Sequence, residues 1–164
     1  MQPLSKESAL FKVETLHIKE MMLQIRQCHS GDFNEVILLL RQLWTDKAVD
    51  PTSLQPIFDR ALVSDSKTYL VVTDENRVIG FGSLSLKDDL WPEGRVAYLD
   101  ELVVDTEYRS KGIGARLLQR LIDTARRKGC YRIELTSAFY RKDSHRFYER
   151  HGFASRAYVF SKVL

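Results

Sequence analysis

The sequence predicts an α/β fold in which one mixed sheet carries helices on both faces. Segments 68–73 and 77–86 are rich in apolar and β-branched residues and are separated by turn residues, which indicates an antiparallel hairpin. Further on, a strand over 95–104, a long amphipathic helix and a strand over 131–137 follow one another. That order indicates a central parallel strand pair joined by a right-handed crossover.

The elements before the hairpin follow from local patterns. Residues 23–27 alternate between apolar and polar side chains and predict a first strand. A helix follows, with Ser30 or Asp32 as its cap and an apolar face at helical spacing. After a polar break over 44–51, a second helical stripe covers 54–62.

The second half of the chain is read in the same way. Residues 87–94, with a proline and a glycine, are expected to form a loop. The long helix ends in basic residues followed by Gly129, which are common stop signals. A short helix over 141–151 and a closing strand over 157–164 complete the prediction.

Length and composition favour one domain. A chain of 164 residues builds one core and is short for two. Residues 1–22 do not continue the regular pattern, so we interpret them as an N-terminal extension and place a single domain at 23–164.

Charge and cysteine content narrow the partners and the compartment. The net charge of +3 is mild, and no dense basic stripe suggests a nucleic-acid partner. No apolar run reaches membrane-spanning length, the N-terminus lacks a signal-peptide core, and two cysteines make no disulfide framework. We expect a cytoplasmic protein with neither a membrane nor a metal as partner.

A glycine loop after the strand over 95–104 is the most specific feature of the chain. Residues 109–114 read Arg-Ser-Lys-Gly-Ile-Gly and open the long helix. A helix N-terminus exposes unpaired amides, and glycine allows close approach, so the loop suits a phosphate or a pyrophosphate. A P-loop needs a wider glycine spacing, and a dinucleotide fingerprint needs a third glycine where this chain has Leu117. Neither motif fits.

Two further segments accompany the pattern Arg-x-x-Gly-x-Gly. They are Tyr-Leu-Asp-Glu-Leu-Val-Val over 98–104 and Phe-Tyr-Glu-Arg-His-Gly-Phe over 147–153. In order and spacing, the three blocks resemble the GNAT superfamily of N-acetyltransferases. The resemblance implies that family's mixed sheet, of about six or seven strands, and acetyl-coenzyme A (acetyl-CoA) as cosubstrate without a metal. Arg141 departs from the family, since many members have Asn there.

The resemblance also implies a cofactor site and a catalytic pair. Tyr148 is the expected general acid for the departing thiolate. The expected base is Asp100 or Glu101; consecutive residues of a regular strand face opposite sides, so only one should face the acceptor. Similarity to polyamine-type acetyltransferases favours Asp100. The cofactor would be held by Leu102, Val103, Val104, Arg109, Ser110, Lys111, Gly112, Ile113 and Gly114.

The expected function is transfer of an acetyl group from acetyl-CoA to a primary amine. Direct attack in a ternary complex is preferred, because no Ser-His-Asp or Cys-His arrangement suggests a covalent acyl-enzyme. A non-catalytic acyl-CoA-binding or regulatory module is the alternative. The acceptor is left open among polyamines, amino acids, aminoglycosides and protein amines, and the resemblance also allows a homodimer.

Overall fold

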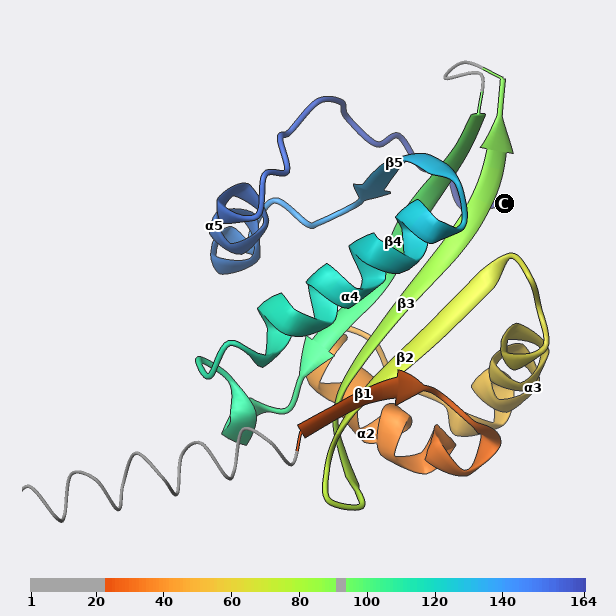
Figure 1. Cartoon of the computed structure of the whole chain (residues 1–164), viewed down its shortest axis with the longest axis vertical. Helices are drawn as coiled ribbons and strands as arrows, with labels where there is room; N and C mark the ends of the chain where they lie inside the picture. Colours follow the sequence, from red (N-terminus) through yellow and green to blue (C-terminus); the bar gives the residue numbers. More distant parts are fainter. Residues whose placement is uncertain (1–22, 91–93) are drawn as a thin grey trace, which may run out of the picture.

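The computed structural model describes residues 23–90 and 94–164, and the predicted N-terminal extension over 1–22 lies outside these ranges. No helix in the described ranges is long and apolar enough to cross a membrane. The elements are, in chain order, β1 (Leu23–Gln27), η1 (Ser30–Asp32), α2 (Phe33–Leu43), α3 (Pro51–Leu62), β2 (Lys67–Asp74), β3 (Arg77–Asp89), β4 (Gly94–Val104), η2 (Thr106–Tyr108), α4 (Ile113–Arg127), β5 (Cys130–Leu135) and α5 (Lys142–Arg150) (Figure 1).

The strands form one mixed sheet in the order β1-β2-β3-β4-β5. β1 to β4 pair antiparallel, and β5 pairs parallel to β4 after the α4 crossover. The hairpin and the parallel pair are therefore confirmed. The described residues supply five strands where about six or seven were expected. The parallel pair, which was expected to be central, lies at one end of this order.

The predicted closing strand over 157–164 is wrong for this structure. These residues have no regular secondary structure, and within the described ranges their backbone makes no hydrogen bond to the sheet. Tyr158, Val159 and Phe160 are exposed. Strand formation needs a paired neighbour as well as a suitable sequence, and that partner cannot be read from the segment itself.

Each face of the sheet buries its own apolar core. On one face, α4 places Leu117, Leu118 and Leu121 against the strands with no exposed surface. Burying such a side chain contributes about 2 kcal/mol. Gly82 in β3 lets α4 come close, because a Cβ there would lie 2.7 Å from Leu121 Cδ1. The helices predicted on both faces are confirmed.

The opposite core is formed by α2 and α3. Phe58 of α3 meets Phe33 and Tyr69 with ring centroids 5.2 and 5.6 Å apart. α3 begins at Pro51, where Asp50 accepts hydrogen bonds from the next two free amides. The two cores fix both faces of β4, the strand that carries the predicted site.

Candidate active site

β4 extends beyond the end of β5. The parallel register ends where Leu99 pairs with Leu135, the last residue of β5, whereas β4 continues to Val104. Figure 1 shows β5 as a short arrow beside a much longer β4. Among the described residues, the β4 edge over 100–104 therefore has no strand partner on the β5 side. Backbone groups on such an edge can bind an extended ligand.

The side chains of this free stretch are occupied by packing. Val103 is 4% exposed and belongs to the core under α2, whereas Leu102 and Val104 pack against the core under α4. Asp105 N donates to Ile79 O of β3, and backbone groups alternate in direction along a strand, so Val103 also faces β3, where it pairs with Phe81. The part available to a ligand is therefore the outward-facing backbone of Leu102 and the amide of Val104.

Segment 109–114 presents a row of backbone amides at the start of α4. Ser110 and Gly112 have φ values of +62° and +76°. In the described part of the chain, none of the amides of 110–115 donates a hydrogen bond, and the first that does is Arg116 N, to Gly112 O at 3.1 Å. Amides aligned at a helix N-terminus form a site for an anionic group.

The basic side chains of the loop hold its shape. Arg109 Nε donates to Val104 O at 2.9 Å, and Lys111 Nζ donates to Glu107 O at 2.9 Å. Lys111 also lies over the Tyr108 ring, 5.0 Å from its centroid. Arg109 therefore links the loop to the end of β4, and both cations remain at the exposed loop.

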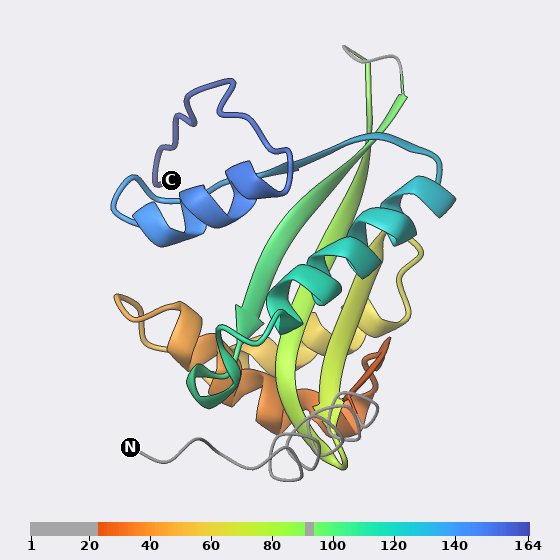
Figure 2. The same cartoon turned by 60° about the vertical axis from the view of Figure 1, so that its left-hand side comes forward.

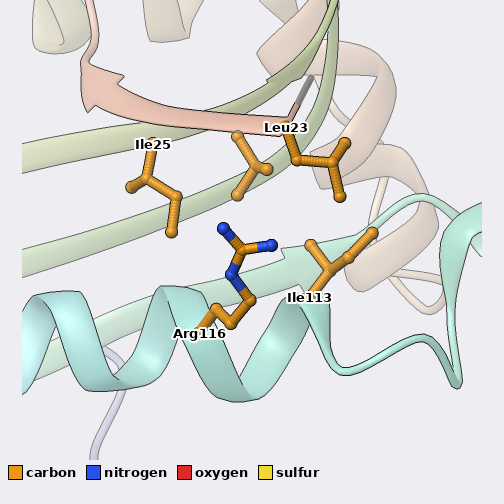
Figure 3. Close-up of a pocket in the computed structure, with 5 residues that line it drawn as sticks. Leu23, Ile25, Ile113 and Arg116 are labelled. Atoms are coloured by element: carbon orange, nitrogen blue, oxygen red, sulfur yellow. The ribbon is translucent and has the colours of Figure 1, made fainter. Parts of the chain in front are cut away.

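Ile113 anchors the start of α4. Its side chain is 3% exposed and points, with Leu23 and Ile25 of β1, into a small hollow beside Arg116 (Figure 3). The hollow has no room for a water molecule, so it is a narrow gap between packed side chains. The side chain thus fixes the helix start, while the amide of the same residue is available to a ligand.

The three sequence blocks meet at Gly114. A Cβ built on this residue would lie 3.7 Å from Val104 Cγ2 and 3.8 Å from Phe147 Cζ. The free end of β4, the first turn of α4 and α5 are therefore neighbours, and Figure 2 shows α5 on the same side of the sheet as α4. The candidate site lies where they meet.

A β-bulge interrupts β4 at the acidic pair. The register pairs Ser83 with Glu101 and Leu84 with Leu99, so Asp100 is an extra residue on the β4 side. A bulge breaks the alternation of side chains along a strand. The prediction that Asp100 and Glu101 face opposite sides of the sheet assumed a regular strand, and it is wrong.

Hydrogen bonds show where the two carboxylates point. Ser83 Oγ donates to Glu101 Oε2, and Ser85 Oγ donates to Asp100 Oδ1 at 2.8 Å. The two serines are alternate residues of β3 and share a face. This is the face of Tyr69, which pairs with Ser83 and packs in the core under α2 and α3. Both carboxylates therefore lie on the α2–α3 side.

The environments of the two carboxylates differ. Glu101 is partly buried, and burial raises the pKa of its carboxyl; Asp100 raises it further, while Ser83 and Lys67 oppose the rise. Asp100 is exposed, and its Oδ2 lies 3.4 Å from Lys67 Nζ. A partly buried carboxylate with a raised pKa has the properties of a general base.

Tyr148 of α5 packs in an aromatic group. Its ring centroid lies 5.3 Å from that of Phe147 and 5.6 Å from that of Phe153. Burial raises the pKa of the phenol to about 12, and the nearby charge of Arg141 acts in the opposite direction. The described residues offer its hydroxyl no hydrogen bond. The phenol is thus protonated at neutral pH and available as a donor.

The phenol and the carboxylates lie on opposite sides of the sheet. Tyr148 packs against the α4 core together with Leu102, Val104 and Leu135, at the end of the β4–β5 pairing. The carboxylates lie on the α2–α3 side. The free end of β4 therefore has a proton donor on one side of the sheet and proton acceptors on the other.

Arg141, the departure from the family pattern, joins α5 to α2. Its Nη2 donates to Leu43 O, at the end of α2, at 2.7 Å. A cation at a helix C-terminus is favourable because it interacts with the last carbonyls. The guanidinium also lies 5.8 Å from the ring centroid of Tyr140. The arginine thus holds α5, which carries Tyr148, against the end of α2.

Sequence reasoning missed Ser83, Ser85 and Lys67, which contact the carboxylates. The signal in the sequence is faint, since serine alternates with leucine over 83–86 in an otherwise apolar strand. That alternation indicates a polar line on one face of β3. Only the register of β3 against β4 shows which carboxylate each serine contacts.

Comparison with known proteins identifies the family. The family model of the acetyltransferase (GNAT) family matches residues 33–153, well over half of the chain. The chain therefore belongs to the GNAT family of acetyltransferases, as its three sequence blocks predicted, and is an acyltransferase.

Two named relatives agree with this family, and one solved structure agrees with the fold. Aminoalkylphosphonate N-acetyltransferase of Salmonella typhimurium is 28% identical over 141 residues, covering 86% of this chain and 91% of that protein. Probable glucosamine 6-phosphate N-acetyltransferase 2 of Oryza sativa is 30% identical over 119 residues, covering 68% of this chain and 72% of that protein. A transcriptional regulator from Bacillus halodurans superposes with a TM-score of 0.81 at 22% identity, covering 87% and 99%, and supports the fold alone.

Proposed function

We propose that this chain transfers the acetyl group of acetyl-CoA to a primary amine, by direct attack in a ternary complex, and that residues 23–164 act as one domain. The observation that carries the proposal is the row of unpaired amides over 110–115 beside the free edge of β4. The family uses acetyl-CoA, whose pyrophosphate suits these amides. Arg109 and Lys111 add positive charge at the same loop.

The free edge of β4 would receive the pantetheine arm. Its backbone groups pair with the amide groups of that arm, and an N–H near Val103 donates to the thioester carbonyl. This donor stabilises the oxyanion that forms when the amine attacks.

Two side chains would move the protons. Glu101 accepts a proton from the amine, directly or through a water molecule. The new C–N bond forms, the tetrahedral intermediate collapses, and the C–S bond breaks. Tyr148 then gives its proton to the departing thiolate and regains one from solvent. Because burial raises the pKa of Tyr148 to about 12, its proton is present at neutral pH.

We assign the base to Glu101 in preference to Asp100. The raised pKa of the partly buried Glu101 makes it a stronger proton acceptor than an ordinary carboxylate. Asp100 is exposed and lies beside Lys67, so it is better suited to attract a cationic amine toward the site. This assignment reverses the preference for Asp100 that the family resemblance suggested.

The acceptor proposed is a small molecule with a primary amine. The names of the two relatives describe an aminoalkylphosphonate and an amino sugar phosphate, both small amines. Each acceptor carries an anionic group, so negatively charged amines belong in any test beside the cationic ones.

Thiol release from acetyl-CoA with a panel of amines tests the proposal. The panel holds an aminoalkylphosphonate, glucosamine 6-phosphate, a polyamine, an aminoglycoside and a lysine-containing peptide. We expect release with at least one small amine, and acetylated product in equal amount. Binding of acetyl-CoA without release for any amine would instead support the acyl-CoA-binding module.

A further inference from the structure

We infer that Ser83 is a positioning residue for the reaction: its hydroxyl aims the Glu101 carboxylate and favours its ionised form. The inference rests on the proposed function, in which Glu101 is the base. Ser85, two residues along the same strand face, contacts Asp100 instead and is not needed for this role.

Ser83 makes both of its side-chain hydrogen bonds with one residue, Glu101. The side chain has no exposed surface, and its Oγ donates to Glu101 Oε2 and accepts from Glu101 N at 3.1 Å. A hydroxyl has one proton to donate, so that proton is committed to the carboxylate. A single buried group thus fixes both the backbone and the side chain of the proposed base.

The bulge makes the contact between Ser83 and Glu101 important for the direction of the Glu101 side chain. Glu101 directly follows the bulged residue Asp100, and the register shifts between Ser83 and Leu84. Bulges increase the local twist and re-aim side chains. The two hydrogen bonds between Ser83 and Glu101 select one orientation of the carboxylate on the α2–α3 face, beside the free edge of β4.

The charged groups around Glu101 explain why a donor is needed. Burial disfavours the carboxylate, and neighbouring Asp100 of β4 disfavours it further. Ser83 of β3 and Lys67 of β2 act in the opposite direction and favour the Glu101 carboxylate. Tyr69 of β2 is neutral, because burial and then the charges of Glu101 and Asp100 raise its pKa to about 12. Ser83 is the buried donor in this set, whereas Lys67 is partly exposed.

Ser85 provides the matched control. Its Oγ donates to Asp100 Oδ1 at 2.8 Å, from the same face and the same strand. Ser83→Ala and Ser85→Ala therefore each remove one serine hydroxyl from one of two adjacent carboxylates. If Asp100 were the base, Ser85→Ala would have the larger effect on the pH profile.

The test is the pH dependence of kcat for both variants, with an acceptor proven by thiol release. A base must be ionised to act, so losing a donor moves the acid limb to higher pH. A hydrogen bond to a charged group is strong enough to move the midpoint by about one pH unit. For Ser83→Ala we expect that shift of the acid limb and an unchanged KM for acetyl-CoA. At pH values below the midpoint of the limb, kcat should be about tenfold lower than in wild type. For Ser85→Ala we expect the wild-type profile.

An unmoved acid limb in folded Ser83→Ala would overturn the inference, and so would an equal shift in Ser85→Ala. Ser83→Cys keeps the volume and a weak donor, and it should give a smaller shift in the same direction. If the alanine variant fails to fold, the cysteine variant decides by the same criterion. Wild-type protein that releases no thiol with any amine contradicts the proposed function itself, which is a different outcome.

Discussion

Replacing Gly112 by alanine separates ligand binding from folding. Gly112 stands at the N-cap of α4 with φ of +76°, and a Cβ there would meet no protein atom within 4 Å. The added methyl group would therefore enter open space at the loop assigned to the pyrophosphate. Gly129, beyond the other end of the same helix, has φ of +74° and equally open surroundings. Gly129→Ala is the matched control.

The expected cost in stability is similar for the two variants. A left-handed conformation costs an L-residue about 1–2 kcal/mol, and the stiffer unfolded chain of the alanine variant returns about 0.4–1 kcal/mol. The net loss of about 1 kcal/mol corresponds to a fall in Tm of about 2–4 °C for a domain of this size. A valine at position 112 would be strained further, which is why alanine is the sharper test.

The expected loss of affinity for acetyl-CoA differs between Gly112→Ala and Gly129→Ala. A hydrogen bond to a charged group contributes about 1.5–3 kcal/mol, so keeping the phosphate away from one amide lowers affinity by about 10- to 100-fold. We expect this loss in Gly112→Ala and wild-type affinity in Gly129→Ala, measured by calorimetry with acetyl-CoA beside thermal unfolding. Wild-type affinity in Gly112→Ala, or an equal loss in both variants, would refute the reasoning.

Three further predictions concern Tyr148, Glu101 and Arg141. Tyr148→Phe keeps the aromatic packing and should lower kcat by about 10²- to 10⁴-fold with an unchanged KM for acetyl-CoA; wild-type kcat across the pH range would exclude it as the acid. Glu101→Gln should abolish activity but not stability. Burial raises the folded-state pKa of Glu101 above its ordinary 4.5, so the wild-type free energy of unfolding falls as pH rises from 4.5 through the folded-state pKa. Urea titrations at several pH values should show this fall in wild type and a weaker one in the variant. Arg141→Met should lower Tm, because Arg141 Nη2 donates to Leu43 O and holds α5 against the end of α2; Arg141→Lys should lower Tm less, and a wild-type Tm in Arg141→Met would contradict this.

The parts of the structure that sequence predicted are those encoded locally. The hairpin turn over 74–76, the apolar stripe of α4 and the glycine at 112 each depend on neighbouring residues alone. The crossover between β4 and β5 follows from a general rule of chirality and connection length. These features were enough to identify the family and to predict a cofactor loop.

The parts that sequence missed depend on contacts between distant segments. The bulge at Asp100 is a property of the register between β3 and β4, and it moves one carboxylate to the other face. The bond between Arg141 and Leu43 joins residues 98 positions apart. The segment over 157–164 has the composition of a strand but makes no backbone hydrogen bond to a strand among the described residues.

Calorimetry with three ligands tests most directly whether the amides over 110–115 hold a diphosphate. The ligands are acetyl-CoA, its 3′-dephospho form, which keeps the diphosphate, and S-acetyl-pantetheine, which lacks it. We predict that the first two bind folded wild-type protein and raise its Tm, and that S-acetyl-pantetheine binds at least about 100-fold more weakly. Equal affinity for S-acetyl-pantetheine, or neither heat nor thermal stabilisation with acetyl-CoA, would contradict the account.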